Sequence, residues 1–338
     1  ERQLDAARAW MKEWHFRVGV HHLRGLIDGF EAGKSYADLA EAVIAALWPV
    51  VATDFAAKHG DMPGRGAVVL GMGSLGAGRL NAGSDLDVIL IYDAAGVEMS
   101  AGKRPLAARP YYARLTQAFV TALSVQTAEG RLYEVDVRLR PSGRQGPVAT
   151  SIESFRNYQE TEAWTWEHLA LTRARVLAGE ATLASEVEDF RRQILASKGK
   201  GEKVRADVDD MRDRLAQAKP GVGGWDAKFG PGRLMDIELL AQTLALQAAV
   251  PARQVERQIA LGAKACGMSQ SDQTALMDAY RLCWRMQAAA KLLSDKTPDP
   301  QTVGLGGQAF LLRETAKASA DDLTTSLTSA TVLAKTVI

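Results

Sequence analysis

The sequence predicts an α+β protein, in which a small mixed sheet is flanked by helices and followed by a long helical region. Short apolar segments typical of strands occur only between residues 64 and 143. On both sides of this region, apolar residues recur every three or four positions, which is the spacing of one helix face. Strands confined to one part of a chain are typical of the α+β class.

The overall composition is that of an ordinary globular protein, with 47% hydrophobic and 24% charged residues. The 338 residues suffice for two or three domains, and 41 basic against 40 acidic residues give no bulk charge that would attract nucleic acid. Two cysteines without C-x-x-C spacing agree with a reducing, cytoplasmic setting.

The longest apolar stretch, residues 42–52, is interrupted by Pro49, so we expect no membrane span. The chain opens without Met or a signal-peptide pattern, so we expect part of a longer polypeptide.

The N-terminal elements follow from periodicity. Residues 1–59 carry the helical spacing, and Gly29 and Gly33 mark the expected turn between two helices. Residues 67–70 and 86–92 are mainly apolar segments of strand length, which predicts two buried strands.

The later elements are predicted in the same way. Residues 105–126 return to the helical spacing, and residues 132–140 alternate between apolar and charged side chains, which predicts a third strand. Pro141 ends this strand. Every segment after Ser151 is expected to be helical, with helix starts near residues 151, 163, 202, 232, 271 and 321.

Residues 68–93, VVLGMGSLGAGRLNAGSDLDVILIYD, carry the most informative motif. The glycines of GMGSLG after an apolar run, with Asp93 twenty positions beyond Gly73, are close to the dinucleotide-binding fingerprint. That fold needs a crossover of a dozen or more residues, and only residues 74–83 precede the next strand. We therefore expect a short helix at Gly73 and Ser74, whose first N–H groups would face phosphate.

A pair of carboxylates opens the second predicted strand. Asp85 and Asp87 alternate along it, so both project from one face. Carboxylates this close repel each other unless a divalent cation neutralises them, and hard oxygen ligands suit Mg²⁺. On the third predicted strand, Asp136 could join this set, while Arg138 and Arg140 could take phosphate oxygens. Alternatively, the charged residues of that strand could simply form the solvent-exposed face of an edge strand.

Taken together, Gly-Ser, ten residues, Asp-x-Asp and a later strand Asp resemble the nucleotidyltransferase fold shared with DNA polymerase beta. The resemblance implies that two metals, Mg²⁺, are held by Asp85, Asp87 and Asp136. It also implies that Gly73 and Ser74 cradle the triphosphate of ATP, with in-line displacement at the α-phosphorus.

Longer phrases are similar to the glutamine synthetase adenylyltransferase family. They are LYEVDVRLRPSG (132–143), EAWTWEH (162–168), TRARV (172–176) and DAKFGPGRLMDIE (226–238). In that family, an N-terminal half removes AMP by phosphorolysis and a C-terminal half adds AMP from ATP to a tyrosine of glutamine synthetase. RLRPSG and EAWTWEH resemble the adenylylating half more closely.

The family resemblance implies three parts for this chain. They are an N-terminal helical segment packing on the core (1–63), a nucleotidyltransferase catalytic domain (64–180) and a helical C-terminal domain for regulation or substrate docking (181–338). Partners implied are glutamine synthetase, ATP and the PII signal protein, with glutamine as an effector. Lys228, in the last phrase, is a candidate nucleotide contact, although Arg233 stands where the family tends to have a glycine.

Three alternatives remain open. The chain could be the AMP-removing half of the same family, which uses phosphate in place of ATP. It could be a nucleotidyltransferase acting on RNA or a small molecule, which the neutral charge and the lack of a basic–aromatic stripe disfavour. It could also be a non-catalytic module that binds a signal protein, although intact Asp85, Asp87 and Asp136 speak against this.

Two further motifs are expected to be structural. DGFEAGKS, residues 28–35, nearly matches the phosphate-binding G-x-x-x-x-G-K-S loop, but Asp28 replaces the first glycine and no strand precedes it. We expect a turn between helices there. Trp164 and Trp166 are expected to anchor the core beneath the sheet.

Overall fold

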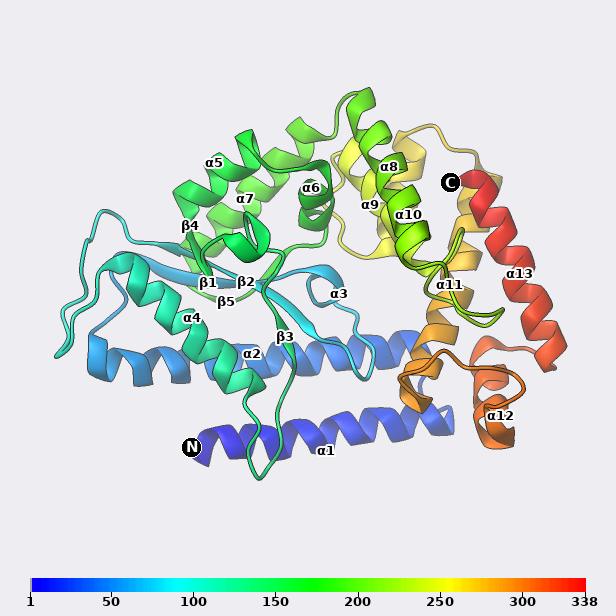
Figure 1. Ribbon diagram of the computed structural model, residues 1–338, viewed down its shortest axis with the longest axis horizontal. Coiled ribbons are helices and arrows are strands. Elements are labelled where there is room, and N and C mark those ends of the chain that lie inside the picture. Colours follow the sequence, from blue (N-terminus) through cyan, green and yellow to red (C-terminus); the bar gives the residue numbers. More distant parts are fainter. Residues whose placement is uncertain (1) are drawn as a thin grey trace. The chain divides into compact units, whose positions relative to one another are not determined.

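The computed structural model describes residues 2–338, which form helices and one small sheet (Figure 1). Contacts divide the chain into two compact units. The first contains the chain up to His15 and residues 37–78 and 84–194. The second contains residues 16–36, 79–83 and 195–338.

Two long helices open the chain, as the periodicity predicts. They are α1 (Arg2–Arg24) and α2 (Gly29–His59). The turn between them lies at residues 25–28, so Gly29 and Gly33 are inside α2 and not in the turn. The reason is Asp28, whose Oδ1 accepts the N–H groups of Phe30 and Glu31 at 2.9 Å and so caps α2.

The expectation about membrane spans needs a correction. Pro49 does not interrupt the helix, because it lies inside α2, which is 31 residues long in total. By length and composition alone, α2 could cross a membrane, and a core helix of a soluble protein meets the same test. Ala40, Ile44 and Leu47 of α2 are buried in the first unit.

The sheet is mixed, which confirms the predicted α+β class. Its strands run in the order β3-β2-β1-β5, and β4 also pairs with β2. Pairs β1–β2 and β1–β5 are antiparallel, whereas β2–β3 and β2–β4 are parallel. The strand bounds are β1 (Gly66–Gly71), β2 (Leu86–Asp93), β3 (Val135–Asp136), β4 (Ala149–Ser151) and β5 (Arg175–Gly179).

The connection from β1 to β2 excludes the dinucleotide-binding interpretation. β1 and β2 are antiparallel neighbours, from Gly66 opposite Asp93 to Gly71 opposite Val88. A dinucleotide-binding unit needs parallel strands joined by a crossover helix. Here the link contains only the four-residue helix α3 (Gly73–Gly76), the short helix that the spacing predicts.

Two strands differ from the sequence prediction. The third strand is only Val135–Asp136 and not 132–140, because the chain turns at Asp136, whose Oδ1 accepts the N–H of Arg138 at 2.8 Å. β5 lies in a region that we expected to be wholly helical. Four of its five residues pair with β1, and the register is irregular between Val69 and Leu70. Local periodicity cannot reveal such a distant partner.

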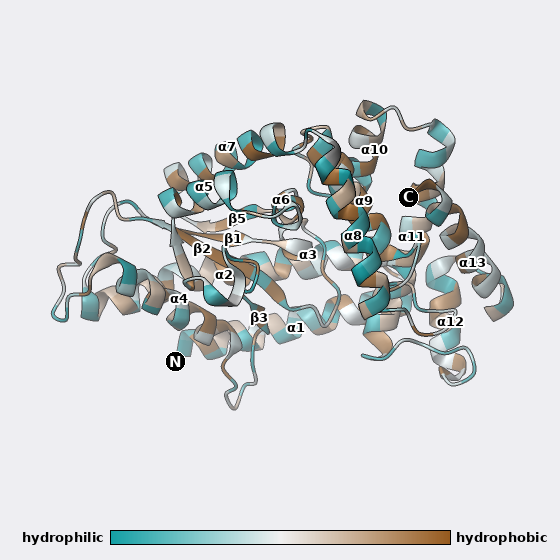
Figure 2. Ribbon diagram, turned by 45° about the horizontal axis from the view of Figure 1, so that its top comes forward, coloured by the Kyte–Doolittle hydropathy of each residue, from teal (hydrophilic) through white to brown (hydrophobic). Residues whose placement is uncertain are grey.

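Helices cover both faces of the sheet in the first unit. β1 and β2 are hydrophobic along most of their length (Figure 2). On one face, Val68 and Ile91 pack in a core with Phe155 of α5 (Ile152–Thr161) and Phe190 of α7 (Ala181–Lys198). On the other side, Tyr92 stacks on Tyr112 of α4 (Ala108–Ser124), with ring centroids 4.1 Å apart.

The second unit is built from helices around its own core. Buried members of that core include Trp225, Ile237, Ile259, Trp284 and Leu311. Helix starts predicted near residues 202, 232, 271 and 321 are confirmed within two residues, whereas α10 and α12 are additional. The bounds are α8 (Glu202–Ala218), α9 (Leu234–Gln247), α10 (Val255–Ala265), α11 (Gln270–Leu293), α12 (Gly304–Thr315) and α13 (Ala320–Val337).

Candidate active site

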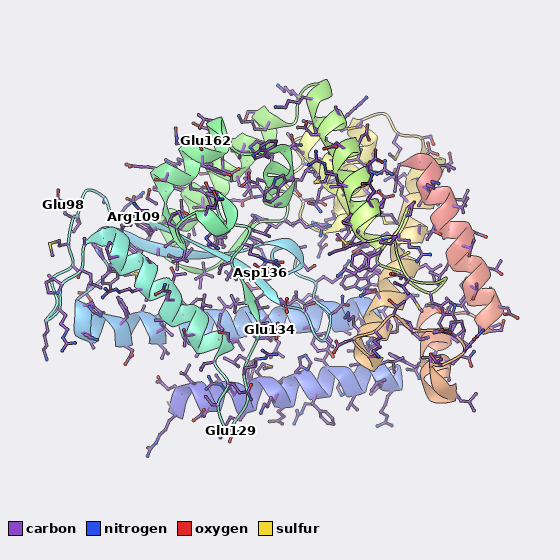
Figure 3. All side chains as sticks on the ribbon, in the orientation of Figure 1. Glu98, Arg109, Glu129, Glu134, Asp136 and Glu162 are labelled. Carbon is purple, nitrogen blue, oxygen red and sulfur yellow. The ribbon has the colours of Figure 1, made fainter. Side chains whose placement is uncertain are left out.

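The candidate site lies in the first unit, where β2 begins and β3 runs beside it. Asp87 of β2 is in register with Asp136 of β3, and Leu86 with Val135. Residues opposite each other on neighbouring strands project from the same face, so the two carboxylates share one face of the sheet. Asp136 lies at the end of β3, two residues after Glu134 (Figure 3). The sheet thus brings together acids that are nearly fifty residues apart in the sequence.

The carboxylates interact electrostatically. Burial, together with the negative charges of Asp136 and Asp85, raises the pKa of Asp87 from 3.8 to about 6, and Arg138 opposes this rise. Carboxylate oxygens are the hard donors that a divalent cation such as Mg²⁺ prefers, and such a cation bound at Asp87 would remove the repulsion from its acidic neighbours.

Asp136 already has a cationic partner. Its Oδ2 accepts a hydrogen bond from Nε of Arg138 at 2.6 Å, in addition to the backbone hydrogen bond at Oδ1. The Arg138 side chain is 61% exposed, so it can move without disturbing the core. Within residues 2–338, no group of three or more His, Cys, Asp or Glu side chains is arranged so that it could hold a metal ion. Release of Asp136 from Arg138 would be part of forming such a group.

Arg140 lies differently from Arg138. It is buried, and its guanidinium donates to the carbonyl oxygens of Val137 at 2.7 Å and Gly146 at 3.1 Å. These bonds brace the turn that follows β3. The alternation that placed both arginines on one strand face therefore fails, because the strand ends before either of them.

The glycine turn lies directly against Asp87. Gly73 has φ of +51°, and a β-carbon there would lie 2.5 Å from Asp87 Oδ2. The N–H of Met72 donates to the carbonyl oxygen of Asp87 at 2.9 Å. Ser74, the next residue of α3, is half-buried. The start of α3 therefore faces the carboxylates, and Gly76 packs so closely on the Arg173 carbonyl that no side chain would fit.

A model of the glutamate-ammonia ligase adenylyltransferase family matches residues 1–190, more than half of the chain. The chain belongs to this family. It is 43% identical to a Rhizobium meliloti protein over 317 residues, which are 90% of this chain and 32% of that protein. It is 40% identical to a Xanthobacter autotrophicus protein over 320 residues, which are 93% of this chain and 32% of that protein. It is 47% identical to an Agrobacterium fabrum protein over 244 residues, which are 72% of this chain and 25% of that protein.

All three relatives are named bifunctional glutamine synthetase adenylyltransferase/adenylyl-removing enzyme. The chain therefore spans about a quarter to a third of the length of the curated relatives it matches. The family's EAWTWEH phrase lies at helix α6 (Thr165–Leu171) of the first unit.

The two tryptophans of that phrase are not core residues, contrary to prediction. Trp164 is 71% exposed and Trp166 is 40% exposed. The buried side of α6 instead carries Glu167, whose carboxylate accepts the Tyr158 hydroxyl and the N–H of Trp164, each at 3.0 Å. Burial raises the pKa of Glu167, and these two hydrogen bonds oppose the rise. The sequence pattern does not distinguish this buried acid from the exposed aromatic residues around it.

Lys228 belongs to the second unit, in the loop between α8 and α9. Burial lowers its pKa, while Glu238 opposes the shift. Asp226 orders this loop, because its carboxylate accepts the N–H groups of Val222, Lys228 and Phe229 at 2.9–3.0 Å. Asp236 similarly accepts the N–H of Gly232 at 2.8 Å and pairs with Arg212. Asp226 and Asp236 thus have structural partners in their own unit.

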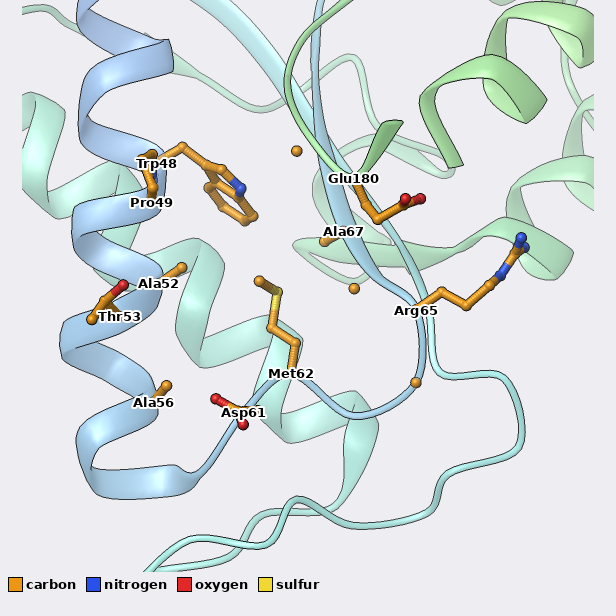
Figure 4. Close-up of a pocket in the computed structure, with 13 residues that line it drawn as sticks. Trp48, Pro49, Ala52, Thr53, Ala56, Asp61, Met62, Arg65, Ala67 and Glu180 are labelled. Carbon is orange, nitrogen blue, oxygen red and sulfur yellow. The ribbon is translucent and has the colours of Figure 1, made fainter. Parts of the chain in front are cut away.

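A cavity of about 570 Å³ in the first unit lies apart from the carboxylates (Figure 4). It is lined by Gly66 at the start of β1, whereas Gly71 at the other end of β1 leads into the glycine turn. The six residues of β1 span roughly 17 Å from one end to the other. The cavity walls are mainly apolar, with Trp48 and Met62, and Asp61 and Glu180 lie at the edge. It is therefore not the site of the candidate chemistry.

Proposed function

We propose that this chain is an ATP-dependent nucleotidyltransferase domain that adds AMP to a tyrosine of glutamine synthetase. The proposal rests on the register of Asp87 with Asp136 beside Gly73. The likeness of RLRPSG and EAWTWEH to the adenylylating half supports this direction of reaction. The names of the relatives from Rhizobium meliloti and Xanthobacter autotrophicus support the same substrate protein.

We assign the core, residues 64–180, to the nucleotidyltransferase fold. Supporting this are a glycine turn and an Asp-x-Asp motif that meet at one sheet edge through the short α3 link. Residues 1–63 would pack on this core, and residues 181–338 would regulate it or dock the substrate protein. PII and glutamine remain proposed partners on the strength of the family resemblance alone.

Asp85, Asp87 and Asp136 are the residues that would hold Mg²⁺. Their oxygens are hard ligands, and the raised pKa of Asp87 reflects burial and a repulsion that a divalent cation relieves. When bound, Mg²⁺ would neutralise charge on the triphosphate and on the leaving group.

The chain's own residues would position and neutralise the reactants. The N–H groups at Gly73 and Ser74 would bind triphosphate oxygens, and Arg138 would exchange Asp136 for a phosphate oxygen. Asp136 would then accept the proton of the attacking tyrosine hydroxyl. A bond forms between the tyrosine oxygen and the α-phosphorus, and the bond to the leaving pyrophosphate breaks. Arg140 would hold the turn that carries Arg138, and Lys228 stays a nucleotide contact predicted from the family phrase.

The function is tested by two reactions on the same domain. With unmodified glutamine synthetase, Mg²⁺ and ATP labelled at the α-phosphate, we expect label on the synthetase tyrosine and release of pyrophosphate. With adenylylated synthetase and inorganic phosphate, we expect no ADP. ADP in the second reaction without labelling in the first would assign the AMP-removing activity instead. A domain that is silent in both, yet folded, would favour the non-catalytic alternative.

A further inference from the structure

The segment between the glycine turn and the Asp-x-Asp motif is anchored by the helical unit. Residues 79–83 belong by their contacts to the second unit, whereas Gly78 before them and Ser84 after them belong to the first. Gly73 lies six residues before Arg79, and Asp85 lies six residues after it. Residues 79–83 are therefore joined by short lengths of chain to the glycine turn on one side and to Asp85 and Asp87 on the other.

Arg79 provides the anchor. Its Nη1 donates to both carboxylate oxygens of Glu256, at 2.9 and 3.0 Å, and to the Tyr280 hydroxyl at 2.8 Å. Its guanidinium also lies over the rings of Phe30, 4.6 Å from the centroid, and Trp284, at 5.3 Å. Only 14% of the side chain is exposed. A guanidinium with an acid, a hydroxyl and two aromatic faces around it is held in one orientation.

Gly33, near the start of α2, leaves the space that the Arg79 side chain occupies. A β-carbon on Gly33 would lie 2.8 Å from Cγ of Arg79 and 2.8 Å from Cζ2 of Trp284. The carbonyl oxygen of Gly33 accepts the N–H of Leu80 at 2.9 Å, which ties the segment's backbone to the same place. The glycine that made residues 28–35 resemble a phosphate-binding loop is thus needed for close packing on Arg79.

We propose that Arg79 is a positioning residue for the candidate site, and this inference rests on the proposed function. By holding residues 79–83 in one conformation, Arg79 restrains the backbone of the loop that joins the glycine turn to Asp85 and Asp87. Loosening this restraint weakens the binding of the divalent cation and of its ATP complex. The carboxylates themselves remain unchanged.

Arg285 offers a matched control in the same unit. It also pairs with an acid, Asp28, at 3.1 Å, and its guanidinium lies 5.9 Å from the centroid of Phe30. It lies on α11 and outside residues 79–83. Arg79→Met and Arg285→Met each remove a cation and an ion pair from the surroundings of Phe30, but only the first releases the segment.

The experiment measures Mn²⁺ binding by electron paramagnetic resonance, KM for the ATP complex, kcat and the melting temperature of each variant. We expect Arg79→Met to weaken Mn²⁺ binding and raise KM by about tenfold, as loss of a supporting residue around a metal site does. Arg285→Met should stay close to wild type in both. Equal Mn²⁺ affinity in the two variants at comparable melting temperatures would overturn the inference.

Milder variants keep the test decisive if Arg79→Met does not fold. Tyr280→Phe and Glu256→Gln each remove one partner of Arg79. Both should weaken Mn²⁺ binding and raise KM, by less than Arg79→Met does. Arg79→Lys, which keeps a cation over the rings, should recover part of the Mn²⁺ affinity; unchanged affinity in all three would also refute the restraint. Mn²⁺ binding requires no AMP transfer, so a wild-type domain that binds Mn²⁺ but transfers no AMP would count against the proposed function only.

Discussion

Gly73 lies so close to Asp87 that a side chain at residue 73 would displace the Asp87 carboxylate: a β-carbon there would lie 2.5 Å from Asp87 Oδ2. Gly73 also has φ of +51°, which L side chains rarely adopt. The backbone turn proposed to bind phosphate and the acid proposed to bind metal are therefore parts of one structure. A side chain at residue 73 would therefore disturb the Asp87 carboxylate.

Gly73→Ala is expected to lower AMP transfer by about 100-fold or more, because displacing a reacting group by about 1 Å has effects of that size. Backbone strain at positive φ adds a stability loss of about 1–2 kcal/mol. Gly96→Ala separates the two effects, since Gly96 has φ of +77° but nothing within 4 Å of its β-carbon position. Similar losses of activity in both alanine variants would show that strain alone, and not contact with Asp87, explains the result.

Asp87→Asn is expected to abolish transfer and yet stabilise the metal-free domain at neutral pH. The folded pKa of about 6 exceeds the unfolded value of 3.8, so the folded state binds more protons, and wild-type stability falls as pH rises from about 4 to about 6. Two pKa units correspond to at most about 3 kcal/mol. Thermal melts from pH 4 to 8 should show the two proteins diverging over this interval, and saturating Mg²⁺ should narrow the gap.

Asp93→Asn is the control for that experiment, because it removes a carboxylate from the other end of β2. Asp93 accepts a hydrogen bond from Arg65 at 2.6 Å and from the N–H of Ala95 at 2.7 Å, so its loss should destabilise the domain or leave it unchanged. If Asp87→Asn failed to raise the melting temperature at pH 7 without metal, the repulsion among the carboxylates would be smaller than the structure indicates.

Glu167→Ala is expected to destabilise the first unit by about 1–3 kcal/mol, since it leaves the Tyr158 hydroxyl and the first turn of α6 without their acceptor. Glu162→Ala, five residues earlier on the exposed side of the same phrase, should change stability by no more than about 0.5 kcal/mol. Denaturant unfolding of both variants gives the comparison, and equal stability would remove the structural role assigned to Glu167.

Sequence reasoning succeeded where the local pattern is strong. The buried runs of β1 and β2 and the spacing along α4 were enough to predict those elements, and the short link between the strands was enough to reject a crossover. These features depend on neighbouring residues alone. The α+β class follows from them.

The remainder depends on contacts between distant residues. The strand β5 has five residues and becomes a strand only through pairing with β1. Trp164 and Trp166 look like core residues by type, yet both are exposed in the folded protein. Arg79 has no local signal at all, because its partners Glu256 and Tyr280 lie 177 and 201 residues away.

Asp136 and Arg138 are expected to shift the pKa of Asp87 in opposite directions. Asp136 raises that pKa through its negative charge, so Asp136→Asn should lower it; Arg138 opposes the rise, so Arg138→Met should raise it further. The titration of the Asp87 carboxyl carbon, followed by NMR on specifically labelled protein without metal, measures both shifts. Metal binding needs the ionised carboxylate, so the pH at which Mn²⁺ binding is half-maximal should move upward in Arg138→Met. Shifts of the same sign in the two variants would mean that their charges do not act on Asp87 directly, and the shared site would have to be abandoned.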